Sequence, residues 1–457
     1  MPNLHCCLFW LILSIGLAAF LPTAYAGGLN DTGQDRCFDG INLVTCTEAN
    51  TGDSSPYPRQ DGRYGRDAQA SAGRLTKIGG GMAGFDFTTL DTNGNPTTPT
   101  SGANPHPCVR DNVTGLMWEV KTNDGGLRDM KKTYTWDNAP SYATAVNAAG
   151  LCGFHDWRMP NLKELAGIVD YSIPYPGPTI NTGYFPNTQS TGFWSSVFAY
   201  PGSPWGVAFG SGYVAYGSRS DDAAIRLVRG GQAFVSLTDN GNGTVTDNST
   251  GLMWEQCSEG QSGTGCAGSA AGMTWADALT AARNSRLGGY SDWRLPNVKE
   301  LQSIVEYGVY IPFIDLAKFP NTLSTWYWTS SSYASDSSGA WYVDLGYGHV
   351  YYDNRNPNLY GLAVRLVRGG QSFDFLNLPP SPINGTCGEA NGQTLASAPS
   401  SDLCYVGTAS AVSVSGRGAG CVAAATEAPV PVARRLLQWI LRVVEVEIPT
   451  RIMVMAE

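Results

Sequence analysis

The sequence predicts an α+β protein that contains one domain twice in tandem. Several motifs of the first half return in the same order in the second half, at offsets of 134 to 139 residues. They are Thr-Gly-Leu-Met-Trp-Glu at 114–119 and 250–255, Asp-Trp-Arg-x-Pro-Asn-x-Lys-Glu-Leu at 156–165 and 292–301, Phe-Pro-Asn-Thr at 185–188 and 319–322, and Arg-Leu-Val-Arg-Gly-Gly-Gln at 226–232 and 365–371. Each copy combines helical periodicity with segments of apolar–polar alternation. The period is the size of an independent domain and too long for a solenoid unit.

The N-terminal 26 residues predict export. An apolar run at 8–21 precedes Ala24-Tyr25-Ala26, which matches the cleavage site of a signal peptide, so we expect the mature chain to begin near Gly27. No Lys or Arg precedes the run, and a membrane-retained helix is the alternative. Because the run is short for a membrane span, we expect a secreted protein, extracellular or periplasmic, with no span in its mature chain.

The composition favours a loop-rich secreted protein. Of 457 residues, 42% are hydrophobic and 15% are charged, and the net charge of −9 is dispersed along the chain. This is enough apolar material for hydrophobic cores. The absence of a basic block argues against nucleic acid as a partner.

The cysteines predict disulfides. Eleven are present, of which Cys6 and Cys7 would leave with the signal peptide, and Cys421 lacks an obvious partner. The candidate pairs are Cys37 with Cys46, Cys108 with Cys152, Cys257 with Cys266, and Cys387 with Cys404. An oxidising compartment and the lack of a C-x-x-C pair favour disulfides over a metal site, so we expect neither metal nor cofactor.

The order of elements follows from local patterns. Residues 27–100 are rich in Gly, Asp, Thr and Pro, which predicts an irregular segment around one small disulfide loop. The first domain is assigned to 101–232 and the second to 233–372. Between the two copies, alternation around Asn-Gly steps at 235–247 predicts a hairpin.

Two helices are expected in each domain. The first follows Thr274 as N-cap and ends before Gly288-Gly289, and its counterpart begins near Pro140. In the second helix Asn161 and Glu164 form a capping box. The apolar stripe there is Leu162, Leu165, Ile168 and Val169, and Asn297, Glu300, Val298, Leu301, Ile304 and Val305 repeat the pattern.

The last third of each copy predicts strands. Trp341, Val343 and Leu345 alternate with polar residues before a turn at 346–348, and residues 205–212 show the same pattern. A further strand at 363–368 closes the second domain.

These motifs, in this order, resemble a bacterial secreted domain family named after the C-terminal part of the Legionella collagen-like adhesin, Lcl. The resemblance covers both copies. It implies an α+β fold related to the C-type-lectin-like group and a surface location. It also implies adhesion, since the namesake binds sulfated glycans and assembles as a trimer.

The chain departs from the namesake in two respects. No collagen-like tract precedes the copies, and the charges are balanced, with ten basic and ten acidic residues in 101–232 and eight basic and twelve acidic in 233–372. Such domains are poor general traps for sulfated polymers. The Glu-Pro-Asn and Gln-Pro-Asp triplets of calcium-dependent lectins are also absent.

Residues that recur in both copies are assigned a structural role, because a shared core also produces recurrence. These are Trp118, Trp157, Arg158, Glu164, Trp194, Trp205, Trp254, Trp293, Arg294, Glu300, Trp328 and Trp341. We expect Arg158 and Arg294 to act with Asp156 and Asp292 in holding the turn before the second helix.

Ligand-binding residues are sought at the tips that are not repeated, because binding groups concentrate in loops on a rigid scaffold. The candidates are Tyr213, Tyr216, Trp326, Tyr347, Tyr351, Tyr352 and Asn354. Ordinary strand tyrosines are the alternative interpretation. The sequence leaves the oligomeric state open.

The C-terminal part changes character twice. Residues 373–421 predict a small cysteine-containing module. Residues 422–457 lack Gly, Ser, Asn and Tyr, which favours a frame-disrupted tail, with a membrane-surface or partner helix as the alternative.

The sequence therefore predicts a non-enzymatic binding or adhesion protein at the cell exterior, with a glycan or a surface protein as ligand. An enzyme acting on extracellular polysaccharide and a structural envelope protein are the alternatives.

Overall fold

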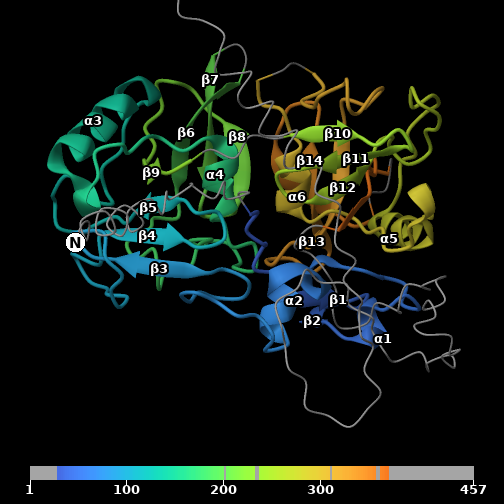
Figure 1. Ribbon diagram of the computed structural model, residues 1–457, viewed down its shortest axis with the longest axis horizontal. Coiled ribbons are helices and arrows are strands. Elements are labelled where there is room, and N and C mark those ends of the chain that lie inside the picture. Colours follow the sequence, from blue (N-terminus) through green and yellow to red (C-terminus); the bar gives the residue numbers. More distant parts are fainter. Residues whose placement is uncertain (1–27, 200–201, 232–235, 309–310, 357–360, 370–457) are drawn as a thin grey trace, which may run out of the picture. The chain divides into compact units, whose positions relative to one another are not determined.

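The computed structural model describes residues 28–199, 202–231, 236–308, 311–356 and 361–369 (Figure 1). The expected signal peptide, the Cys387–Cys404 pair, the module at 373–421 and the tail at 422–457 lie outside these residues. Among the described residues, no helix is long and apolar enough to cross a membrane.

Each copy contains two helices and two sets of antiparallel strands. The first comprises β3 (Phe87–Leu90), β4 (Cys108–Asp111), β5 (Met117–Glu119), α3 (Ala139–Ala149), α4 (Leu162–Gly167), β6 (Gly192–Ala199), β7 (Ser203–Ala208), β8 (Tyr213–Tyr216) and β9 (Val228–Arg229). The second comprises β10 (Leu237–Asp239), β11 (Thr244–Asp247), β12 (Leu252–Glu255), α5 (Trp275–Asn284), α6 (Val298–Ser303), β13 (Trp326–Ser332), β14 (Gly339–Asp344), β15 (Val350–Asn354) and β16 (Val367–Gly369). The α+β prediction is confirmed.

The predicted helix starts are confirmed. Thr274 accepts from the Asp277 backbone N–H at the start of α5, and Pro140 lies in the first turn of α3. Asn161 forms a capping box with Glu164, and Asn297 forms the equivalent one in α6. The apolar stripe continues beyond the helix: Ile168 and Val169 follow the end of α4 and are also buried.

The segment at 27–100 is irregular over most of its described length, but it also includes short helices and strands. The segment contains β1 (Arg36–Phe38), β2 (Leu43–Thr45), α1 (Glu48–Thr51) and α2 (Gly65–Ser71), and the expected Cys37–Cys46 disulfide joins β1 to the residues after β2. It also contains β3, which pairs with β4 from Phe87↔Asp111 to Leu90↔Cys108, side by side with it in blue to cyan in Figure 1. The first copy therefore begins before residue 87. The matching hairpin of the second copy, β10–β11, closes through a short Asn-Gly turn that the sequence reveals, whereas β3 and β4 are separated by a long loop.

Two four-stranded sheets, in the orders β3-β4-β5-β9 and β10-β11-β12-β16, belong to single copies. The third sheet belongs to both. Its order is β13-β14-β15-β8-β7-β6, and the two copies meet where β8 pairs with β15 at Val214↔Val350. We call the line between β8 and β15 the seam.

The seam has the form of a two-fold interface within one chain. Val214 and Val350 occupy equivalent positions, 136 residues apart, and pair with each other in antiparallel register. Lys163 of α4 donates to Ser303 O at the end of α6 (2.7 Å), and its equivalent Lys299 donates to Gly167 O at the end of α4 (2.9 Å). In a homodimer this reciprocity defines an isologous contact.

Buried aromatic rings repeat the same reciprocity. Trp205 of the first copy contacts Tyr307 of the second with ring centroids 5.1 Å apart, and Trp341 contacts Tyr171 at 4.9 Å. All four rings belong to one hydrophobic core that extends through both copies. Two smaller cores lie under α3 and α5; the first belongs to the first copy, and the second combines the second copy with Phe38 of the N-terminal segment.

Candidate functional site

The candidate tips from both copies meet at the seam. Tyr213 of β8 lies 4.9 Å from Tyr351 of β15 and 6.1 Å from Tyr352, measured between ring centroids. Tyr216 and Tyr347 both contact His349, at 4.9 and 6.3 Å. The register of one strand pair therefore joins residues that are about 136 positions apart in sequence.

Of the two remaining candidates, Trp326 is connected to these rings and Asn354 is not. Trp326 stacks on Tyr342 (4.9 Å), which lies 6.5 Å from Tyr351. Asn354 is exposed at the end of β15 but lies outside the ring contacts. We call the connected set the aromatic surface: Tyr213, Tyr216, Trp326, Tyr333, Tyr342, Tyr347, His349, Tyr351 and Tyr352.

The aromatic surface includes three residues that the sequence analysis did not select. Tyr333 stacks face to face on Tyr352 at 3.7 Å, and Tyr342 and His349 link the predicted rings. His349 precedes Tyr351 by two positions, so strand periodicity indicates a shared side of the sheet.

The outer rings are available to a ligand. The most exposed is Tyr347, which is 60% exposed in the turn between β14 and β15, while Tyr213 and Tyr351 are half-buried. Burial lowers the pKa of His349, which favours its neutral form near pH 7. Burial raises the pKa of Tyr342, and the nearby carboxylates Asp344 and Asp353 add to this effect. The surface thus combines exposed aromatic rings with a local negative charge.

The residues assigned a structural role are buried or hydrogen-bonded within the fold. Trp118, Trp157, Trp194, Trp254, Trp293 and Trp328 are all buried. Arg158 binds Glu164 through two hydrogen bonds of 2.8 and 2.7 Å, and Arg294 binds Glu300 through two of 2.6 and 2.7 Å.

The aspartates before these arginines also form charge-assisted hydrogen bonds, as expected for residues that hold the turn. Asp156 accepts from Arg229 of β9 (2.7 Å), and Asp292 from Arg368 of β16 (2.7 Å). A planar guanidinium favours the two parallel hydrogen bonds that each turn arginine makes to its capping-box glutamate. Each arginine therefore fastens the turn to the helix, and each aspartate fastens it to the closing strand.

The other recurring glutamate is fully engaged inside the fold. Glu119 accepts from Lys121 Nζ (3.0 Å), Tyr142 Oη and the Leu227 N–H (2.9 Å). Burial raises the pKa of its counterpart Glu255 to about 8, and the neighbouring Glu259 adds to the effect. Among the described residues, no cluster of three or more His, Cys, Asp or Glu is arranged to hold a metal ion.

The comparison with known domains agrees with this architecture. Residues 107–229 and 243–368 each match the Lcl C-terminal domain. The chain belongs to the Lcl C-terminal domain family. No curated protein matches it. Three of the four expected disulfides lie in the described residues and are present, namely Cys37–Cys46, Cys108–Cys152 and Cys257–Cys266.

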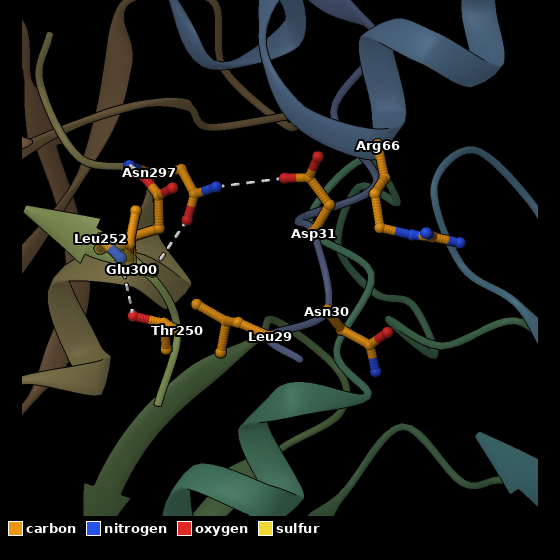
Figure 2. Close-up of a pocket in the computed structure, with 8 residues that line it drawn as sticks. All are labelled: Leu29, Asn30, Asp31, Arg66, Thr250, Leu252, Asn297 and Glu300. Carbon is orange, nitrogen blue, oxygen red and sulfur yellow. Dashed lines mark hydrogen bonds between the residues drawn. The ribbon is translucent and has the colours of Figure 1, made fainter. Parts of the chain in front are cut away.

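A second feature lies where the N-terminal segment meets the two Lcl C-terminal domains. Residues 29–34, which we call the strap, follow an extended path along one side of a small pocket (Figure 2). The pocket is lined by Leu29, Asn30, Asp31, Arg66, Thr250, Leu252, Asn297 and Glu300. Figure 2 shows the Asn297 amide pointing at Asp31, to which Nδ2 donates at 3.1 Å.

Three carboxyl groups are buried close together here: that of Asp31 in the strap and those of Asp61 and Asp67. Asp61 accepts from Thr32 Oγ1 (2.8 Å) and Ser331 Oγ (2.5 Å), and Asp31 accepts from the backbone N–H of Asp67 (3.0 Å). Burial raises the pKa of all three, and that of Asp61 reaches about 7, with Asp31 and Glu300 contributing by repulsion. The nearby ammonium of Lys299 opposes this effect, and its own pKa falls to about 8 through burial.

This arrangement predicts that Asp61 destabilises the fold as the pH rises. A carboxyl whose pKa is raised on folding contributes stability below its unfolded pKa and loses it as pH rises through the folded value, here from about pH 4 to about 7. Asp61→Asn should therefore reduce the loss of unfolding free energy between pH 5 and pH 8 by on the order of 2 kcal/mol. Urea unfolding at the two pH values measures this loss.

The exposed Asp222→Asn variant serves as the control and should leave the difference between the two pH values unchanged. An Asp61→Asn protein with the pH dependence of the parent would contradict the assignment.

Proposed function

We propose that the protein is an exported, non-enzymatic binding protein whose aromatic surface holds a glycan. The observation that carries the proposal is the convergence of half-buried and exposed rings from both copies on the seam. Rings of Tyr and Trp offer flat apolar faces, and their hydroxyl or N–H groups bond to polar neighbours. Sugars present complementary apolar C–H faces and hydroxyl groups.

The charge of the surface narrows the ligand class. Asp344 and Asp353 lie beside the rings, and we find His349 in a setting that favours its neutral form. Carboxylates repel sulfated polymers. The proposed ligand is therefore an uncharged saccharide, which differs from the sulfated glycans that the family resemblance implies. A relation of the fold to the C-type-lectin-like group remains part of this proposal.

A non-enzymatic role is supported by the engagement of the recurring carboxylates. Glu119 is surrounded by internal donors, and Glu164 is held by Arg158 and by the backbone N–H of Asn161. Secretion is supported by three disulfides, which persist in oxidising compartments.

The test is a glycan-array screen followed by titration with the full mature chain, at two salt concentrations and with and without calcium. Tyr347→Ala and Tyr351→Ala should each weaken binding about ten-fold, equivalent to about 1.4 kcal/mol. Affinity should change little with salt, because no charged ligand group is involved.

Phe198→Ala is the matched control. Phe198 is 38% exposed, close to the 36% of Tyr352, but it packs on Trp136 of the first copy and not on the aromatic surface. Equal weakening by all three substitutions, or no saccharide binding at all, would reject the proposal. Binding to cell-surface protein alone would move the ligand class from glycan to protein.

A further inference from the structure

Both copies hold the strap through its backbone. The N–H of Tyr171 in the first copy donates to Thr32 O (2.8 Å). From the second copy, Lys299 Nζ donates to Asp31 O (2.7 Å). The strap therefore lies in a groove to which both copies contribute.

One strap side chain closes the other end of this groove. Gln34 Nε2 donates to Tyr171 O (2.7 Å) and to Ser332 O (2.9 Å). Between these anchors, Gly33 adopts a φ of +86°, and a Cβ there would lie 2.2 Å from Asp170 Oδ1. The groove thus accepts an extended segment with glycine at one fixed position. We call it the strap groove, formed by Tyr171, Asn297, Lys299 and Ser332.

The two-fold relation between the copies generates a second groove. Tyr171, Asn297 and Lys299 correspond to Tyr307, Asn161 and Lys163 at an offset of 136 residues, and Ser332 corresponds to Phe198 at an offset of 134. The equivalence is structural, because Asn161 and Asn297 both cap a helix, and Lys163 and Lys299 both donate to the end of the opposite helix. We call this set the second groove.

The second groove is open where the strap groove is filled. Every residue of α6 is buried, whereas in α4 only Leu162, Leu165 and Ala166 are. Ser332 is buried and its equivalent Phe198 is exposed. Within the described part of the chain, nothing takes the position over α4 that the strap takes over α6.

Donors in the second groove have fewer acceptors as a result. Lys299 Nζ donates to two carbonyls, Asp31 O and Gly167 O, but Lys163 Nζ donates to Ser303 O alone among the described residues. Asn297 Nδ2 reaches Asp31, and Asn161 Nδ2 has no equivalent acceptor among the described residues. These are the groups that an incoming extended segment would satisfy.

We propose that the second groove is a docking site for an extended segment of a partner protein with the chemistry of the strap. That chemistry is an Asn or Asp that accepts from Asn161, a backbone carbonyl for Lys163, and a glycine followed by a carboxamide side chain. A second copy of the same chain is a poor source, because each chain carries one strap and holds it in its own strap groove. A tethered strap also outcompetes a free one through its high effective concentration.

A labelled peptide with the sequence of residues 28–35, Gly-Leu-Asn-Asp-Thr-Gly-Gln-Asp, tests the proposal on the full mature chain. Fluorescence anisotropy should show one saturable site. Lys163→Met should weaken binding at least about ten-fold, while the matched Lys299→Met should leave it unchanged. A peptide with valine in place of Gly33 should not bind. Absence of saturable binding, or equal weakening by both lysine substitutions, overturns the proposal.

Disulfide trapping locates the peptide independently of Lys163, which also caps α6. A peptide with Gln34→Cys should cross-link to a Phe198→Cys protein and not to a Ser218→Cys protein, since both residues are exposed but only Phe198 belongs to the second groove. Equal cross-linking at both positions rejects the site. Concentration-dependent self-association that requires the strap, measured by sedimentation, would overturn the choice of a partner protein in favour of a second copy.

Discussion

Replacing Arg294 by alanine is expected to lower the free energy of unfolding by about 3–5 kcal/mol, as measured by urea denaturation. Arg294 and Glu300 are both buried, with 3% of each side chain exposed, and two hydrogen bonds of 2.6 and 2.7 Å join them. Removing the guanidinium leaves the Glu300 carboxylate buried without its paired cation. This loss exceeds that of an exposed ion pair because water cannot replace the missing partner.

The first copy provides the matched control. Arg158 binds Glu164 with the same geometry, but 29% of the Arg158 side chain is exposed. Water reaches this pair, so Arg158→Ala should cost less, about 1–2 kcal/mol. Equal losses at the two positions would show that burial beneath the N-terminal segment does not strengthen the second pair.

Replacing Trp341 by alanine is expected to remove about 3–5 kcal/mol and to destabilise both copies together. Trp341 is buried in the core that both copies share, with Tyr171 of the first copy at 4.9 Å and Tyr333 of the second at 5.4 Å. The cavity would open at the seam, where the sheet and the core are continuous between the copies. A single unfolding transition at lower temperature is the expected calorimetric result.

Trp205→Ala is the symmetric test, since Trp205 contacts Tyr307 across the same seam at 5.1 Å. It should produce the same single, shifted transition. Two separate transitions, with the first copy unaffected by Trp341→Ala, would contradict the shared core.

Local features of the fold were predictable from the sequence, because each is encoded within a few residues. Asn161 and Glu164 have the spacing of a capping box and so predict the start of a helix. Cys257 and Cys266 lie close enough in the sequence to predict their disulfide. The buried tryptophans were also predictable, since a loop-rich domain has few other large apolar groups.

Features that depend on contacts between distant parts of the chain were not predictable from the sequence. The pairing of Val214 with Val350 leaves no local trace, because each strand alone shows only ordinary alternation. The strap was equally hidden, since its sequence is polar and it gains order from Tyr171 and Lys299. The tyrosine candidates were found from the sequence, but their convergence into the aromatic surface required the seam.

The two-fold seam changes the order of the association reaction. Two separate subunits that met through the same surface would dissociate on dilution, and their stability would depend on subunit concentration. Here the linker between β9 and β10 carries both halves on one chain, so their meeting is unimolecular and its equilibrium is independent of concentration. Dilution therefore leaves intact the aromatic surface to which both copies contribute, whereas a dissociable dimer would lose it.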